Sequence, residues 1–482
     1  MLIQQTPDTY EKVQALSSMA TDDVLSPPQG ATSVLSRAPY SASERNPVPG
    51  VYRAQMPNGK SISLLRVMFT DFCKMDCHFC PNSHWVPRKR FSFKVDELAK
   101  LFHDMQSREV VAGLFLSSGV AGTGSKTTEK LLQVVDAIRN KYGFKGYIHM
   151  KVMPGTDYHL VAEAYRLATR VSVNIETPTV DHMHRLSRMK DLERDILDPM
   201  RWVVKLGEKD GSGAAGQATQ MVVGAADESD LDIYGRMDQL YNQWKLKRVY
   251  YVNFRPIRFT PLEEHAAPHM AREGRLYQMD WLRRIYQFSD DEMGKAFDPH
   301  GFLSLEHNPK MVIAMENVES FPVDLNKADR RLLLRVPGIG PIAAERIVNV
   351  RRRHSVDTWR DLQAMGVVKK WAWPFVNFPG HKPDPGRQLR LNLFKEAREG
   401  EAEMSETSEG SSRPVLPSLV RETVAAYAAA GVEGSGGPYS AMPEGRDSVA
   451  TAAAPCGQTR SCAGCPLYGA PGHPGSQSGG LN

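Results

Sequence analysis

The sequence predicts an α/β fold, a parallel sheet with βα crossovers that closes wholly or partly into a TIM-type barrel, followed by a small all-α domain and a tail. Three observations carry this prediction. Short apolar runs alternate with helix-like stretches from residue 61 to 288, the pattern from 321 to 376 is helical, and the composition beyond 401 is poor in large apolar groups. A doubly wound open sheet is the alternative for the first region.

Six apolar runs of strand length alternate with helix-like stretches in the first region. The expected strands cover residues 61–69, 111–119, 146–154, 170–176, 218–225 and 248–254. The expected helices between them cover residues 95–105, 128–143, 158–168, 193–206 and 230–245. Each helix can return the chain to the same end of the sheet, so the alternation favours parallel pairing.

The length of 482 residues allows several domains. We expect an N-terminal extension over 1–50, a barrel over 51–290, a connector over 291–320, a helical domain over 321–380, and a linker with a largely disordered tail over 381–482. There is neither a run of eighteen apolar residues nor a basic and apolar leader, which predicts a cytoplasmic protein with no membrane segment. The net charge of +5 permits a polyanionic partner.

The loop after the first expected strand contains Cys73, Cys77 and Cys80, half of the six cysteines of the chain. Cytoplasmic thiols stay reduced, so such a cluster favours metal binding or redox chemistry over disulfides. Three thiolates are one short of a closed zinc site, whereas on a four-iron cluster they leave one iron open to chemistry. A zinc site with a distant fourth ligand, or cysteines without a metal, are the alternatives.

The spacing Cys73-x3-Cys77-x2-Cys80, with Phe79 before the last cysteine, resembles the signature loop of the radical SAM enzymes. The resemblance implies a radical SAM barrel, with a [4Fe-4S] cluster on these cysteines and S-adenosyl-L-methionine (SAM) bound at the open iron. It implies that an electron from the reduced cluster cleaves SAM to a 5′-deoxyadenosyl radical, which abstracts hydrogen from the substrate. It also implies a cellular electron donor such as flavodoxin or ferredoxin. Phe79 is expected against the adenine.

The second expected strand ends in Ser117, Ser118 and Gly119. The superfamily usually carries a Gly-Gly-Glu segment there, which holds the methionyl amino group. Small residues still allow a ligand to approach the backbone, and we expect all three to contact the cofactor. Because no acidic residue stands in this segment, the group that binds the amine is left open.

Two further strand ends are expected to contact the cofactor. Ser172, Asn174 and Glu176 alternate along the fourth expected strand and so share one face, which suggests ribose and carboxylate contacts. A solvated strand end is the alternative. Gly224, at the end of the fifth expected strand, resembles the glycine-containing segment that backs the adenine.

The stretch that follows Gly119 nearly matches the phosphate-binding pattern G-x4-G-K-[ST]. Gly124 fits, but Ser125 stands where the lysine must be, and Lys126 comes one residue late. The lysine would be out of register with the phosphates, which argues against a nucleoside triphosphatase.

The helical domain contains a tight turn between two expected helices. The first helix is expected to be capped by Asp324 or Asn326 and to run through Leu334, and the second to begin near Ile342. This pattern resembles the helix-hairpin-helix motif of DNA-handling proteins, whose turn glycines and helix amides face a phosphate. The expected hairpin contacts are Pro337, Gly338, Ile339, Gly340 and Pro341.

Cationic residues near the hairpin support a phosphate interface. Arg351 and Arg352 are expected to contact DNA, and Arg353, Lys369 and Lys370 add charge nearby. Such contacts position a protein on DNA without reading its bases. A hairpin used only for packing is the alternative, and a second unit over 356–375 looks degenerate because it lacks a Gly-x-Gly turn.

A barrel of this kind followed by the hairpin resembles the bacterial family of DNA modification or repair radical SAM proteins, from about residue 10 to 380. The resemblance is carried, in this order, by the segments 48–54, 113–119, 146–155, 275–288 and 332–340. The resemblance implies a radical enzyme directed at DNA. It assigns neither a catalytic residue nor a reaction. Two other interpretations stay open: a DNA-binding accessory protein with a structural or redox-sensing cluster, and a radical enzyme that acts on RNA or protein.

The tail carries the remaining cysteines, Cys456, Cys462 and Cys465. One hypothesis is a second metal site, zinc or an auxiliary cluster, completed by His473. Reduced, exposed thiols are the alternative.

Overall fold

The structure is a computed structural model that describes residues 7–20, 48–55, 61–210, 216–385 of the chain. All of these belong to one compact unit, Met1–Glu433. The expected linker and tail beyond residue 385, with Cys456, Cys462 and Cys465, lie outside the described residues. Within the described part of the chain, no helix is long and apolar enough to cross a membrane.

The first domain is built on a seven-stranded sheet whose strands follow one another in sequence order. β1 pairs antiparallel with β2, and all later neighbours pair in parallel. A doubly wound sheet would reverse its strand order part-way, so the sequential order identifies a partial barrel and confirms the expected fold class. The strands are β1 (Val51–Gln55), β2 (Ser61–Met68), β3 (Gly113–Ser117), β4 (Tyr147–Lys151), β5 (Arg170–Ser172), β6 (Gly216–Val223) and β7 (Arg248–Asn253).

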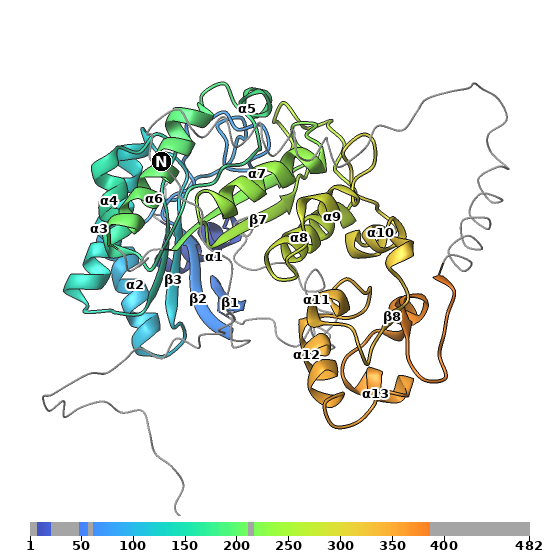
Figure 1. Cartoon of the computed structure of the whole chain (residues 1–482). Coiled ribbons are helices and arrows are strands. Elements are labelled where there is room, and N and C mark those ends of the chain that lie inside the picture. Colours follow the sequence, from blue (N-terminus) through green and yellow to red (C-terminus); the bar gives the residue numbers. More distant parts are fainter. Residues whose placement is uncertain (1–6, 21–47, 56–60, 211–215, 386–482) are drawn as a thin grey trace, which may run out of the picture. The chain divides into compact units, whose positions relative to one another are not determined.

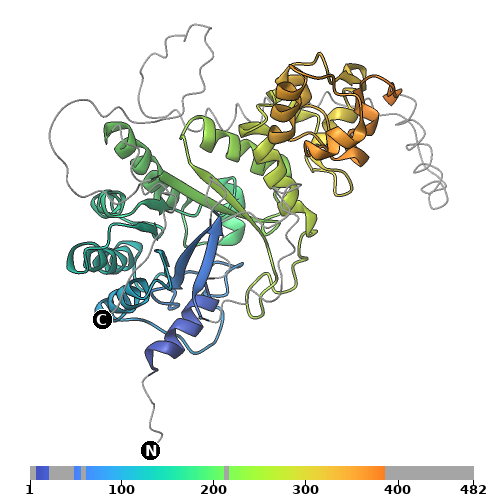
Figure 2. The same ribbon diagram turned by 90° about the horizontal axis from the view of Figure 1, so that it is seen from below.

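Helices cover the outer side of the curved sheet (Figures 1 and 2). Most begin with a side-chain cap, as at Thr123, whose hydroxyl accepts the Lys126 N–H and starts α3. The helices of this domain are α1 (Thr9–Ser18), α2 (Val95–Ser107), α3 (Gly124–Asp136), α4 (Tyr158–Leu167), α5 (Val180–Leu186), α6 (Asp198–Asp210), α7 (Asp230–Asn242), α8 (Ala271–Arg284), α9 (Asp290–Gly294) and α10 (Pro309–Met315).

Alternation along the strands separates an apolar outer face from a more polar inner face. On β4, Ile148 and Met150 belong to the main hydrophobic core, whereas His149 and Lys151 do not. Ser117 of β3 and Gln220 of β6 likewise lie outside that core and line a cavity with Lys151. The inner face therefore presents polar side chains at the carboxyl ends of the parallel strands.

The second domain has a separate hydrophobic core. Its helices are α11 (Arg330–Leu333), α12 (Pro341–Val350), α13 (Trp359–Ala364) and α14 (Lys369–Ala372), and a strand pair, β8 (Val323–Asp324) with β9 (Val376–Asn377), joins its two ends. The helices match the expected helical domain, and the short strand pair was not anticipated.

The expected cap of the first hairpin helix is wrong. Asp329, rather than Asp324 or Asn326, caps α11, because its carboxylate accepts the Leu332 N–H at 2.6 Å. Asp324 instead accepts the N–H of Asn326, whose amide in turn pairs with the backbone of Val356. Residues 324–328 thus form a turn before the helix.

Candidate functional site

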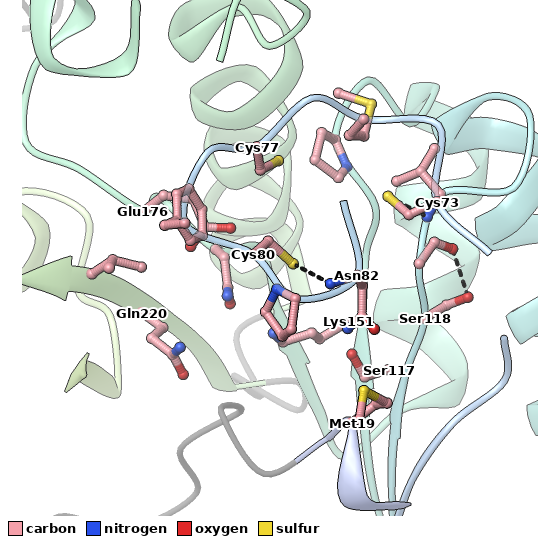
Figure 3. A pocket seen from close by; sticks show the side chains of 18 of the residues that line it. Met19, Cys73, Cys77, Cys80, Asn82, Ser117, Ser118, Lys151, Glu176 and Gln220 are labelled. Atoms are coloured by element: carbon pink, nitrogen blue, oxygen red, sulfur yellow. Dashed lines mark hydrogen bonds between the residues drawn. The ribbon is translucent and has the colours of Figure 1, made fainter. Parts of the chain in front are cut away.

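The three cysteines of the loop after β2 line one cavity of about 170 Å³ (Figure 3). Cys77 is buried, Cys73 and Cys80 are half-buried, and all three are free thiols. Backbone N–H groups of Val120 and Asn82 point at the sulfurs of Cys73 and Cys80, each at 3.4 Å. The cavity opens at the carboxyl ends of the strands, where parallel barrels place their sites.

One arginine holds the ends of the cysteine loop together. The guanidinium of Arg90 donates to four backbone carbonyls, those of Asp71 at 2.8 Å, Asn82 at 2.9 Å, Ser83 at 2.8 Å and Val86 at 2.8 Å. These carbonyls lie outside the helices and strands, and that of Ser83 also accepts the Val86 N–H at 3.3 Å. Arg90 therefore supplies hydrogen bonds that secondary structure supplies elsewhere.

Replacing Arg90 with methionine is expected to lower the free energy of unfolding of the first domain by about 3 kcal/mol, because several carbonyls lose a charged donor. Iron uptake during reconstitution should fall with it. Thermal unfolding and iron analysis measure the two effects. Lys89→Met is the matched control, since Lys89 makes an exposed ion pair with Glu11 and lies over the Phe91 ring, and it donates to none of these carbonyls. Equal behaviour of the two variants would contradict the role of Arg90.

Asp76 joins the cysteine loop to the segment that follows α5. Its carboxylate accepts the hydroxyl of Ser187 and, at 2.9 Å, the N–H of Arg188. Burial favours the neutral acid, but these hydrogen bonds outweigh it and hold the pKa of Asp76 below its usual value. The link matters because Lys190 follows in the same turn and its N–H also reaches Ser187.

Lys190 brings a buried positive charge to the cysteines. Its ammonium lies 3.4 Å from the Glu176 carboxylate and 5.7 Å from the centre of the Phe79 ring. Burial opposes the charge, but Cys77 and Glu176 raise the pKa of Lys190 above its usual value. Burial also raises the pKa of the Cys77 thiol to about 11 and raises that of Cys80. These thiols must lose their protons when they bind a metal.

Ser117, Ser118 and Gly119 all line the cavity, as expected for residues beside a cofactor. A side chain on Gly119 would place its Cβ 2.5 Å from the carbonyl oxygen of Phe72. Only glycine therefore allows the end of β3 to pack against the start of the cysteine loop.

The structure brings together only some of the other expected contacts. Phe79, Asn174 and Glu176 line the cavity. Ser172 is not among the lining residues, and its hydroxyl pairs with Nε2 of buried His149 at 2.9 Å. Gly224 is also not among them, and its N–H pairs with the carboxylate of Glu228. Glu176 has a φ of +63°, a left-handed conformation rare for this residue type.

Sequence reasoning missed several polar residues of the cavity. Lys151 and Gln220 lie on β4 and β6, and reading every strand end for polar residues would have found Lys151. Lys190 lies between helices, in a turn without any motif. The described residues contain no group of three His, Cys, Asp or Glu side chains placed to hold a single metal ion.

The hairpin of the second domain turns at Gly338, whose φ is +81°. A Cβ there would lie 2.6 Å from the carbonyl oxygen of Val368, and the Gly338 carbonyl accepts the Val368 N–H at 2.9 Å. Gly340 caps α12, and a Cβ on it would meet only the Tyr286 hydroxyl, at 3.5 Å. Gly338 thus serves packing, while Gly340 leaves room at the start of the helix. Pro337 and Ile339 are buried, and Pro341 is half-buried.

The unit expected to be degenerate also forms a hairpin. α13 and α14 are joined through Gly366, whose φ is +97°, so a single glycine suffices for this turn. The Val368–Gly338 hydrogen bond joins the two hairpins.

The cations near the hairpin differ in their roles. Arg351 donates to the carbonyls of Leu325 and Ala328 and so supports the domain itself. Arg352 and Arg353 are exposed, and Lys369 lies over the stacked rings of Trp359 and Trp373.

Comparison with known protein families assigns both regions. Residues 67–225 match the radical SAM superfamily, and residues 318–370 match a helix-hairpin-helix motif. The chain carries a radical SAM domain. The helix-hairpin-helix motif follows it, which confirms the two expected regions in the expected order. The narrower resemblance to DNA modification or repair proteins stays a prediction.

Solved structures match this chain only loosely. Methylornithine synthase overlaps over 45% of this chain and 60% of its own, with 15% identity and a TM-score of 0.38. The FeFe-hydrogenase maturase HydG from Carboxydothermus hydrogenoformans overlaps over 44% of this chain and 48% of its own, with 13% identity and a TM-score of 0.35. The cobalamin-dependent SAM radical enzyme OxsB overlaps over 78% of this chain and 60% of its own, with 12% identity and a TM-score of 0.31. The chain spans about 60% of the length of methylornithine synthase. Overlaps of this size carry no argument about activity, and no curated protein matches the sequence.

Proposed function

We propose that this chain is a radical SAM enzyme that acts on DNA, in modification or repair. The observation that carries the radical chemistry is the convergence of Cys73, Cys77 and Cys80 in one cavity of the radical SAM domain. The helix-hairpin-helix motif supports the proposal that the substrate is a nucleic acid. Both parts are open to test separately, because they reside in domains with separate cores.

The residues present fit a [4Fe-4S] cluster. Three free thiols face one cavity, and two of them already receive a backbone N–H, the kind of hydrogen bond that tunes cluster sulfurs. Three protein ligands would leave one iron of such a cluster for SAM. When bound and reduced, the cluster supplies the electron that cleaves SAM to a 5′-deoxyadenosyl radical.

The Glu176–Lys190 pair is suited to the methionyl end of SAM. The pair carries one negative and one positive charge in the wall of the cavity, and the methionyl group carries an ammonium and a carboxylate. Glu176 would accept the ammonium and Lys190 would donate to the carboxylate. This assigns to Glu176 the role of the acid that is absent from Ser117–Gly119. Phe79, which packs with Val222 and Phe254, would face the adenine.

Glu176→Gln is expected to weaken SAM binding about tenfold, because a charged acceptor for the ammonium becomes a neutral amide. Iron content should stay unchanged, since Glu176 is not a cluster ligand in this proposal. Calorimetry on the reconstituted protein measures the affinity. Glu193→Gln, on a half-buried carboxylate that pairs with Arg201 away from the cavity lining, is the control. An unchanged affinity in Glu176→Gln would place the methionyl site elsewhere.

DNA is proposed to lie against the hairpin through its phosphates. The amides at the start of α12 carry the positive end of the helix dipole, and Arg352 and Arg353 are exposed at its far end. Such contacts favour backbone binding without base recognition.

Anaerobic reconstitution tests the proposed function as a whole. The reduced protein should cleave SAM, and incubation with duplex DNA should change one nucleotide, detected by mass spectrometry after digestion. Absence of cleavage would favour a DNA-binding accessory protein. If SAM were cleaved but modified products appeared only on RNA or protein, the substrate would be RNA or protein instead of DNA.

A further inference from the structure

Two large apolar side chains are exposed beside the buried cysteine. Trp85 is 41% exposed and Met189 is 50% exposed, whereas Cys77 is only 5% exposed. Asp76 connects the two, although they are far apart in the sequence. The Trp85 indole N–H donates to the Asp76 carbonyl at 3.0 Å, and the Met189 N–H donates at 3.2 Å to the Ser187 hydroxyl, which binds the Asp76 carboxylate.

This region carries two exposed cations, and its exposed acid, Asp191, accepts the N–H of Arg194. Lys74 and Arg188 are exposed, and neither forms an ion pair with a described residue. The acidic residues of the loop do not offset them, because Asp71 and Asp76 are buried and engaged in hydrogen bonds. The rings of His78 and His84 lie 6.5 Å and 4.5 Å from that of Trp85 and extend the aromatic surface.

A short bonded path leads from this surface to the cysteine. The indole of Trp85 is hydrogen-bonded to the carbonyl of Asp76, and that carbonyl is part of the peptide bond to Cys77. Met189 precedes Lys190, whose ammonium lies against Glu176 in the cavity. The path from exposed Trp85 to Cys77, a proposed cluster ligand, therefore consists of one hydrogen bond and the Asp76–Cys77 peptide bond.

We propose that Trp85, Met189, Lys74 and Arg188 form an electron-entry surface, on which an acidic one-electron carrier protein docks to reduce the cluster. The inference rests on the proposed function, which needs one electron for each SAM cleaved. The carrier loses one electron and the cluster gains it, with no proton or leaving group involved.

The composition favours a docking surface over incidental exposure. Single exposed apolar residues are common on proteins and need no explanation. Here, however, tryptophan, methionine and arginine occur together and exposed acids of the loop are absent, which is the composition enriched in protein interfaces. The unpaired cations complement an acidic partner and would speed its approach.

The test compares two reductants of the reconstituted full-length chain. Reduced flavodoxin is the acidic carrier and dithionite the small-molecule control, with cluster reduction followed by stopped-flow absorbance. In Lys74→Glu/Arg188→Glu, the rate with flavodoxin should fall at least about tenfold and lose its dependence on salt, while the rate with dithionite stays the same. Trp85→Leu should lower the rate at saturating flavodoxin and also raise the half-saturating concentration, because Trp85 is both a contact of the carrier and the start of the path to Cys77. Lys130→Glu/Arg108→Glu, exposed on α3 and after α2, is the matched control.

Each outcome decides the proposal. Parental flavodoxin rates in the charge-reversal variant would overturn it, as would equal losses with dithionite or in the control. A loss of DNA affinity with unchanged flavodoxin rates would assign the surface to nucleic acid instead. If reconstitution is poor, rates normalised to cluster content and the milder Lys74→Gln/Arg188→Gln variant still give the comparison. Failure of dithionite-driven SAM cleavage in the parent would instead contradict the proposed function.

Discussion

Cys77→Ala is expected to remove the iron–sulfur cluster from the reconstituted radical SAM domain. With only two thiolates left on the loop, iron should fall from about four atoms per chain to nearly none, together with the brown colour and the cleavage of SAM. Among the described residues the only cysteines are Cys73, Cys77 and Cys80, so no further described thiol can take the place of Cys77. Iron analysis and visible absorbance make the measurement.

The tail cysteines are the natural control for this experiment. Replacing Cys456, Cys462 and Cys465 with alanine should leave the cluster of the radical SAM domain intact. If that variant held less iron than the parent, or less zinc than the parent, the difference would reveal the hypothesised second metal site. A full four-iron complement in a Cys73, Cys77, Cys80 triple variant would falsify the cluster assignment.

Gly340→Val is expected to weaken duplex DNA binding about tenfold, or about 1.4 kcal/mol, while the domain stays folded. A side chain at the helix start would keep a phosphate from the amides, and the only neighbour within reach is the Tyr286 hydroxyl. The loss should be similar for all DNA sequences and the affinity should fall with salt. SAM cleavage without DNA should persist, because the cysteines lie in the other domain.

Two further glycine variants make this result interpretable. Gly274→Val, in open space on α8, should bind DNA as the parent does. Gly338→Val is a poor probe, since its side chain would collide with the Val368 carbonyl at a φ of +81° and disrupt the domain. Parental DNA affinity in a folded Gly340→Val protein across a salt titration would remove the hairpin from the interface.

The sequence by itself determined the features whose signal is local. The alternation of apolar runs predicted β2 to β7 and their helices, because burial on both faces of a parallel sheet leaves its mark within each segment. The spacing of Cys73, Cys77 and Cys80 indicated the cluster, because all three ligands lie on one loop. The Gly338 turn likewise indicated the hairpin. The antiparallel edge strand β1 was not predicted, because its five residues do not form an apolar run.

Only the tertiary structure decided which distant residues meet in the cavity. Arg90 and Asp76 order the loop through backbone groups, and Lys190 reaches the cysteines because Asp76 holds the Ser187 turn. The pairing of Ser172 with His149, away from the cavity wall, is likewise a matter of packing. The physical reason is that hydrogen bonds and ion pairs form wherever the fold brings partners within about 3 Å, and sequence separation does not limit that distance.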